Sequence, residues 1–234
     1  MVDPIARSGG RGAREIEPGA PAEVDLRAQA FARELAGVLS ALDSVLGESL
    51  GLYASSERAT GKHLYRVLAE NGFHTPAELR DNLGEREFRR LVVEPWKARA
   101  LEFSRGLIER HPEERVIDPA RFYFAGWTPR EYRTLWGTVL RTRVRTLHFG
   151  DDWEYGEGCC HDFKIAWEIG LPTFDADGVP ISLSDGRHRI QSAMLELEAD
   201  GFDTAGHAAA LQNLGRQNRV APAELEEPPN SGDN

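Results

Sequence analysis

Residues 146–162 read TLHFGDDWEYGEGCCHD, a short and mostly apolar run followed by an acidic loop and the start of a helical pattern. Residues 146–149 predict a strand, because the run is short, rich in β-favouring side chains and closed by a glycine. From Gly158 onward apolar side chains recur at helical spacing, and Gly170 predicts the end of that helix. A strand that leads through a loop into a helix is the unit of a parallel sheet, so this stretch indicates an α/β fold.

The same alternation of short apolar runs and helical patterns extends in both directions. Predicted strands cover residues 91–93, 115–117 and 173–174, and predicted helices cover residues 97–111, 129–141 and a last long stretch that is capped by Ser182 or Ser184 and ends at Gly201. This order predicts a parallel sheet flanked by helices. Ligands bind outside the carboxyl ends of strands in such sheets, so we expect chemistry in the loops after Val93, Ile117 and Phe149.

The stretch before Arg90 has a different pattern and predicts an N-terminal helical region over residues 23–90. Apolar side chains from Leu35 to Leu46 fall on one helical face. A second helix is predicted from Lys62 to Asn71, and a third begins at Thr75, which suits an N-cap before a proline. The apolar stripes indicate core packing or an oligomer interface. The α/β domain is then expected over residues 91–215.

The two ends of the chain, residues 1–22 and 216–234, are predicted to be disordered tails, because they contain few large apolar side chains. The formal charge of −10 over 234 residues disfavours nucleic acid and anionic membranes as partners. No apolar run is long enough to span a bilayer and no signal peptide is visible. The two cysteines, Cys159 and Cys160, are adjacent and form no disulfide framework, so we expect a cytoplasmic protein.

The densest cluster of functional residue types is the segment from Asp151 to Asp162. Two glycines, Gly156 and Gly158, would let the backbone approach a ligand closely. Asp162 is expected in the first turn of the following helix, where the helix dipole favours its charged form. An ionised carboxylate that faces a cleft can attack or stabilise an anomeric carbon.

The order of these motifs along the chain resembles bacterial members of the nucleoside 2-deoxyribosyltransferase-like superfamily. The residues that carry the resemblance are Pro95, the run Val116-Ile117-Asp118-Pro119, Trp127, Tyr132, Trp136, the run Asp152-Trp153-Glu154, Gly158 and Asp162. In that superfamily a Val-Ile-Asn-Pro-like stretch follows the first helix. A Gly-Trp-Glu segment then leads to a glycine that is followed four residues later by a nucleophilic glutamate. The resemblance covers roughly residues 91–200.

The resemblance implies a Rossmann-like sheet and N-glycosidic cleavage or deoxyribosyl transfer on a nucleoside or nucleotide, without a metal or organic cofactor. Asp162 is implied as the nucleophile, one methylene shorter than the usual glutamate. Nucleotide-hydrolysing relatives carry a phosphate-binding serine where this chain has Glu157 between two glycines, which favours a nucleoside. Relatives often complete the site from a second subunit, so a homo-oligomer is also expected.

Supporting roles are assigned to the neighbouring residues. Asp151 or Asp152 is expected to bind the base edge or help protonate the leaving base, and Tyr155 to hydrogen-bond the nucleophile or a sugar hydroxyl. The alternatives are a solvated acidic turn and a tyrosine on the surface. Trp153 is expected to stack on the base, and the alternative is a tryptophan in the core. The remaining candidate substrate contacts are Glu154, Gly156, Gly158 and Pro95, the last in a Val-Glu-Pro stretch where many relatives have Gly-Pro.

Blander or different interpretations stay open beside this one. The run Cys159-Cys160-His161 offers zinc-ligand types, but adjacent residues rarely converge on one ion and no second cysteine pair exists. The segment from Asp185 to Arg189 resembles a motif of ParB-like nucleases, and we interpret it as the polar first turn of the last helix. Two other functions remain: a catalytically inactive nucleoside- or nucleotide-binding sensor, and an interaction scaffold that uses the N-terminal helices.

Overall fold

The computed structural model describes residues 21–47, 49–57 and 60–214. Both predicted tails lie outside these residues, except that Pro21 and Ala22 begin the first helix, α1 (Pro21–Leu46). A four-stranded sheet is formed by β1 (Gly51–Ser55), β2 (Val116–Ile117), β3 (Val144–Phe149) and β4 (Thr173–Phe174). Its order is β2-β1-β3-β4 and every pair of neighbouring strands is parallel. The protein is therefore an α/β protein with a parallel sheet flanked by helices.

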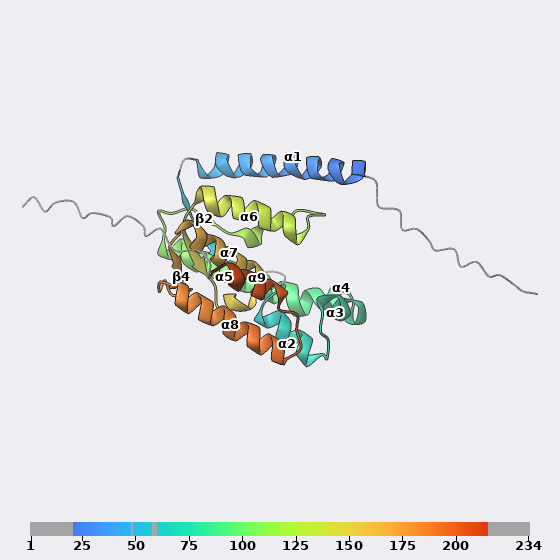
Figure 1. The fold of residues 1–234 in the computed structure, drawn as a ribbon. Helices are drawn as coiled ribbons and strands as arrows, with labels where there is room; N and C mark the ends of the chain where they lie inside the picture. Colours follow the sequence, from blue (N-terminus) through green and yellow to red (C-terminus); the bar gives the residue numbers. More distant parts are fainter. Residues whose placement is uncertain (1–20, 48, 58–59, 215–234) are drawn as a thin grey trace, which may run out of the picture.

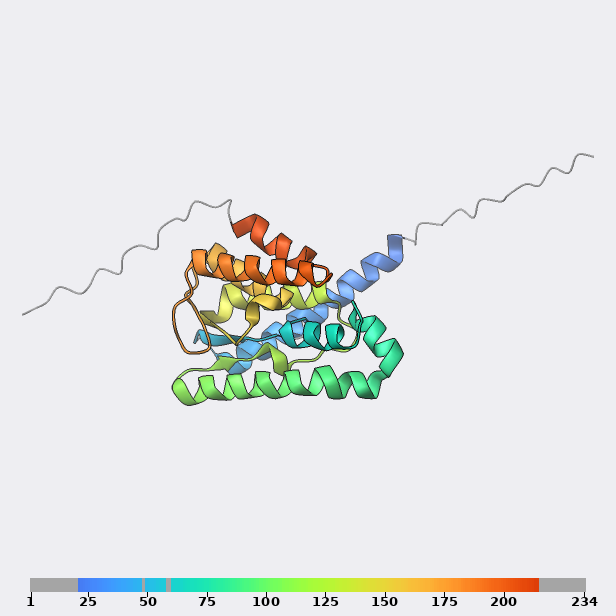
Figure 2. The same ribbon diagram turned by 90° about the horizontal axis from the view of Figure 1, so that it is seen from below.

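The central strand, β1, is buried along its whole length and separates two apolar layers. On one face Leu52 and Ala54 pack with Leu107 of α5 (Glu94–Arg110). On the other face Tyr53 joins the largest core cluster, to which α6 (Pro129–Arg143) and α7 (Glu157–Ile169) contribute. Successive side chains of a strand point to opposite faces, so five residues anchor helices on both sides of the sheet. Figure 2 shows α5 on one side of the strands and α8 and α9 on the other.

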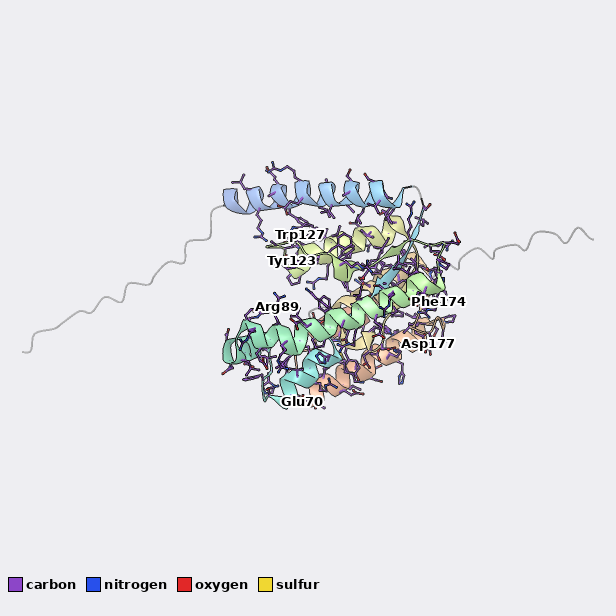
Figure 3. All side chains as sticks on the ribbon, turned by 180° about the vertical axis from the view of Figure 1, so that it is seen from behind. Glu70, Arg89, Tyr123, Trp127, Phe174 and Asp177 are labelled. Carbon is purple, nitrogen blue, oxygen red and sulfur yellow. The ribbon has the colours of Figure 1, made fainter. Side chains whose placement is uncertain are left out.

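The helix α1 lies across α6 on the outside of the molecule (Figure 1). Leu42 and Leu46 are buried in the main core cluster, as the apolar stripe predicts. Nearer the start of the helix, Phe31 contacts the ring of Trp127 with 5.1 Å between centroids, and Figure 3 shows Trp127 beneath α1. The amphipathic face of α1 is thus core packing against its own chain.

A second core cluster joins the helices that follow β1 to α8. It contains residues of α2 (Lys62–Glu70), α3 (Pro76–Leu83), α4 (Glu85–Phe88), the π-helix η1 (Arg89–Val93) and α8 (Leu183–Ala199). The last described helix is α9 (Ala205–Leu214), which packs on α7 and α8. Two 3-10 turns complete the fold, η2 (Pro119–Arg121) and η3 (Trp153–Tyr155). None of the helices in the described part of the chain is long and apolar enough to cross a membrane.

The strand predicted at residues 91–93 is wrong, because these residues form η1 and run on into α5. A short apolar run has the same composition in a buried helix as in a strand. Pro95, in the first turn of α5, has no N–H for the carbonyl of Leu91 four residues earlier. The Nε2 of His63 contacts that carbonyl oxygen at 2.7 Å instead, so the π-helical turn leaves no unsatisfied acceptor there.

The strand β1 was not predicted, since residues 51–55 fall inside the region expected to be helical. This strand pairs with β2 on one side and β3 on the other, so the sheet draws on both sides of the boundary expected at residue 90. The other predicted elements are confirmed in type: β2, β3 and β4 among the strands, and α1, α2, α3, α5, α6, α7 and α8 among the helices.

Candidate functional site

The carboxyl ends of β1 and β3 form one edge of the sheet, where Ser55 pairs with Phe149. After β1 the chain crosses to β2 on one side, and after β2 it returns to β3 on the other side of β1. Such a reversal of strand order opens a crevice at the strand ends, which is where open α/β sheets bind ligands. The candidate site is therefore the space between the loops that follow β1 and β3.

A cavity of about 460 Å³ lies at this edge. Its walls come from the loops after β1 and β3 and from α2, α5 and α8: Glu57, Lys62, His63, Tyr65, Arg66, Ala69, Arg99, Asp151, Asp152, Tyr155, Glu196, Leu197 and Asp200. Its size suits a small organic molecule. Two of the predicted catalytic residues, Asp152 and Tyr155, and one predicted binding residue, Asp151, are among those that line it.

Glu57 follows β1 by two residues and is held between α2 and α5. Its Oε1 accepts a 2.7 Å hydrogen bond from the backbone N–H of Lys62, and its Oε2 lies 3.4 Å from the Arg99 guanidinium. The side chain is only 9% exposed. Burial raises the pKa of Glu57 to about 7, against the opposing effects of the Lys62 N–H and Arg99. This carboxyl group can therefore carry a proton near neutral pH.

Gly61 makes the placement of Glu57 sterically feasible. Its φ is 153°, and a Cβ at this position would lie 2.3 Å from the Glu57 carboxyl carbon. Any larger residue would displace the carboxyl group or the start of α2. A glycine is thus required at position 61 because the Glu57 carboxyl group approaches the backbone closely there.

Lys62 and Asp152 form an ion pair across the cavity, with 3.1 Å between Nζ and Oδ1. The hydrogen bond to Asp152 raises the pKa of Lys62. Asp152 has a left-handed backbone with φ 56°, and it alone among the described non-glycine residues has a positive φ. Aspartate tolerates this conformation better than most residues, and such outliers cluster at functional sites. The turn holds the Asp152 carboxylate over the cavity.

Tyr155 lines the cavity with its ring, and Lys62 Nζ lies 4.9 Å from the ring centre. Its hydroxyl donates a hydrogen bond to the carboxylate of Glu196 on α8. Burial and this carboxylate raise the pKa of Tyr155, so the phenol stays protonated. The expected bond from Tyr155 to the nucleophile is replaced by this contact to Glu196.

Asp162 lies at the same edge of the sheet, where the Ser55 hydroxyl donates a 2.9 Å hydrogen bond to Oδ2 of Asp162. Ser55 is the last residue of β1 and is buried. Asp162 itself is half-buried and is not one of the residues that line the cavity. It stands in the second turn of α7, because the helix begins at Glu157. The expectation of a first-turn position is wrong, and the carboxylate is oriented by Ser55 instead.

Trp153 and Glu154 are not among the residues that line the cavity. Trp153 is fully buried and packs against Phe149, with 4.4 Å between ring centroids, and against Phe163. It is a core residue, so it does not stack on a ligand as expected. Glu154 is mostly buried and forms a 3.0 Å ion pair with Arg189 of α8. Both residues fix the loop after β3 onto the helices that support the site.

The glycines of the loop have different surroundings. Gly156 is buried at the N-cap of α7, next to Cys159 and Thr60. Gly158 is exposed, and a Cβ there would meet no protein atom within 4 Å, so no contact within this chain requires a glycine at this position. The backbone N–H of Glu157 donates to the Thr60 hydroxyl at 3.0 Å. That N–H already has an acceptor and is not open to a phosphate.

Pro95 belongs to the first turn of α5 and is not among the residues that line the cavity. Cys159 and Cys160 are free and buried. Burial raises the pKa of both thiols and keeps them protonated. Within the described residues no group of three or more His, Cys, Asp or Glu side chains could hold a metal ion.

Sequence reasoning missed the cavity walls contributed by α2, α5 and α8. Glu57, Lys62, Arg99 and Glu196 come from outside the loop after β3. The signal that could have found Glu57 is its place three residues after the apolar run of residues 51–54, once that run is interpreted as a strand. Comparison of the chain with protein-family models, with curated proteins and with solved structures gives no match.

Proposed function

We propose that the protein cleaves or transfers the N-glycosidic bond of a nucleoside-like substrate, with Asp162 as the nucleophile. The observation that carries this is the hydrogen bond of 2.9 Å from the Ser55 hydroxyl to Asp162, at the carboxyl end of the central strand, where Ser55 stands two residues before Glu57 of the cavity wall. The strand order, with its reversal at β1, supports a Rossmann-like site and a relationship to the nucleoside 2-deoxyribosyltransferase-like superfamily.

The charges around the cavity favour a nucleoside over a nucleotide. Among its described lining residues, five carboxylates stand against three Lys or Arg side chains. All three cations already have a carboxylate partner: Lys62 with Asp152, Arg99 with Glu57 and Arg66 with Glu70. A phosphate would have to displace these carboxylates, and the first N–H of α7 is occupied by Thr60. A substrate with neutral hydroxyl and amide groups meets no such penalty.

In the proposed reaction the base occupies the cavity and the anomeric carbon reaches Asp162. A carboxylate oxygen of Asp162 attacks this carbon and forms a glycosyl-enzyme intermediate, which passes its sugar to water or to another base. The Ser55 hydroxyl orients the other oxygen, Oδ2, and stabilises the charged form of the carboxylate before attack. Asp151 and Asp152 line the cavity, and in this proposal they bind the edge of the base.

The first prediction is that Asp162→Asn abolishes base release without unfolding the protein. Asparagine keeps the size of the side chain and an oxygen for the Ser55 hydroxyl, but it is not nucleophilic. A chromatographic screen of nucleosides, deoxynucleosides, nucleotides and NAD measures the free base, and circular dichroism measures the fold. Release should fall by at least about 1000-fold, which corresponds to roughly 4 kcal/mol of barrier.

The matched control is Asp177→Asn, in the exposed loop after β4 (Figure 3). This variant should release base at the wild-type rate. Equal release by wild type and Asp162→Asn would contradict the assignment of Asp162 as nucleophile.

A second candidate is a nucleoside-binding module without catalysis. It is favoured by one observation, the absence of Asp162 from the residues that line the cavity. Ligands of the same panel would then raise the melting temperature of the wild type while no free base forms. Release of free base by the wild type would exclude this candidate.

A further inference from the structure

The loop after β1 places a carboxyl group in the cavity wall that the mechanism above does not use. Glu57 comes from the central strand, two residues beyond the Ser55 that orients Asp162. It lines the same cavity as Asp151 and Asp152. The two strand ends therefore supply carboxyl groups to both sides of the space where the base is proposed to bind.

The two oxygens of Glu57 are held unequally. The bond from the Lys62 N–H to Oε1 is 2.7 Å, a normal length, whereas the contact of Arg99 with Oε2 is 3.4 Å, at the outer limit for a hydrogen bond. The first bond comes from the backbone and fixes the position of the carboxyl group. The second oxygen is weakly engaged and can carry a proton.

The charged and titratable groups around Glu57 come from four elements. They are Lys62, His63 and Tyr65 of α2, Arg99 of α5, Asp152 of the loop after β3 and Cys159 of α7. Of the two cations, Lys62 is paired with Asp152, so Arg99 alone opposes protonation of Glu57 by charge, and its side chain is half exposed. Burial outweighs the opposing effects of the Lys62 N–H and the Arg99 guanidinium, and it brings the pKa of Glu57 to about 7.

We propose that Glu57 is the general acid that protonates the leaving base, and that the same residue then serves as the base for the incoming water. This inference rests on the proposed function. As the glycosidic C–N bond breaks, its electron pair passes to the base nitrogen, which takes the proton of the Glu57 carboxyl group. An oxygen of Asp162 forms the new bond to the anomeric carbon. In the second step water attacks that carbon, the Glu57 carboxylate takes the proton of the water, and Asp162 leaves as a carboxylate.

The alternative is that Glu57 only braces the loop and the start of α2. Glu57→Gln separates the two roles, because the glutamine carbonyl still accepts from the Lys62 N–H but the amide cannot deliver a proton. The second prediction is that this variant loses at least about 100-fold in the release of a nucleobase, the range expected of a general acid. The loss should be in kcat more than in KM.

A substrate whose leaving group needs no proton makes the test specific. On the 4-nitrophenyl glycoside of the same sugar, the rate of the first step in Glu57→Gln, measured as a burst of 4-nitrophenol, should be within about threefold of the wild-type rate. The wild type should lose nucleobase release as the pH rises through about 7, and Glu57→Gln should lack this limb. The pH profile of the wild type tests the proposal even where the variant folds poorly.

The matched control is Glu70→Gln, at the exposed end of α2 (Figure 3), which should keep both activities and the pH limb. Equal losses of activity on both substrates, or an unchanged pH limb in Glu57→Gln, would overturn the role of Glu57 as general acid. Neither result would contradict the role of Asp162 as nucleophile. Absence of any base release by the wild type would overturn the proposed function and this inference together.

Discussion

At the scale of single residues, burial decides the behaviour of Glu57. The folded state holds the proton of this carboxyl group more tightly than the unfolded chain does, because its pKa is raised from 4.5 to about 7. Between these two values the folded protein loses stability as the pH rises, by about 3 kcal/mol at most. The loss is complete above about pH 7 and absent below about pH 4.5.

The third prediction is that Glu57→Gln becomes more stable relative to the wild type as the pH rises from 5 to 8. A neutral side chain removes the cost of burying a charge. Thermal melts of both proteins at several pH values measure the effect, which should reach several degrees at pH 8. Glu70→Gln is the control, since Glu70 is 65% exposed and should show no such trend. A stability difference that does not vary with pH would contradict the raised pKa.

The residue scale also shows what the sequence could reveal about the site. The cluster at residues 151–162 directs attention to the loop after β3, which contributes Asp151, Asp152 and Tyr155 to the cavity wall. Polar residues at a predicted strand end can be recognised without knowledge of the rest of the fold. Trp153 was misplaced, since the sequence does not tell whether an aromatic ring in a loop faces the core or a ligand. Glu57 was missed because its strand was missed.

At the scale of elements, helix starts were predictable because local chemistry determines them. Thr75, Thr128 and Ser182 each accept the hydrogen bond of an N-cap, and the first two form a reciprocal capping box with a glutamate. In contrast, β1 and η1 were not predictable, since both are short apolar runs. Pairing with two strands stabilises β1, whereas residues 91–93 run on into α5 and pack against α2.

The fourth prediction concerns the contact between α2 and η1. His63→Ala removes the donor to the Leu91 carbonyl, which Pro95 cannot replace, and should destabilise the protein by about 1–3 kcal/mol. Urea unfolding measures this, with the exposed His188→Ala as the control. Burial lowers the pKa of His63, so the neutral ring donates through Nε2. Equal stability of the two variants would show that the Leu91 carbonyl finds another donor.

At the scale of the whole molecule, α1 is part of the core and not an appendage. It packs on α6 and buries Leu42 and Leu46 against the layer that supports the sheet. The amphipathic stripe predicted the helix, but it did not reveal whether the partner surface belonged to this chain or to another. That choice depends on the position of α6, which only the complete fold defines.

The fifth prediction follows from this packing. Leu42→Ala should destabilise the protein by about 2–5 kcal/mol, the range for a buried leucine, and the whole chain should unfold in one transition. Leu26→Ala on the same helix is the control, since Leu26 is 66% exposed and should change stability by less than about 0.5 kcal/mol. A separate early transition in the Leu42 variant would mean that α1 unfolds independently of the sheet.

The close approach of Gly61 to Glu57 has a consequence for evolution. A side chain at position 61 would occupy the space of the Glu57 carboxyl group, so the two positions cannot vary independently. In an alignment of homologous chains, a glutamate at position 57 should always be accompanied by glycine at position 61. Lineages that replaced the glycine should carry a smaller residue at position 57, and under the proposal above they should also have lost the proton donor. Covariation between these two columns would therefore mark which homologues have kept the acid.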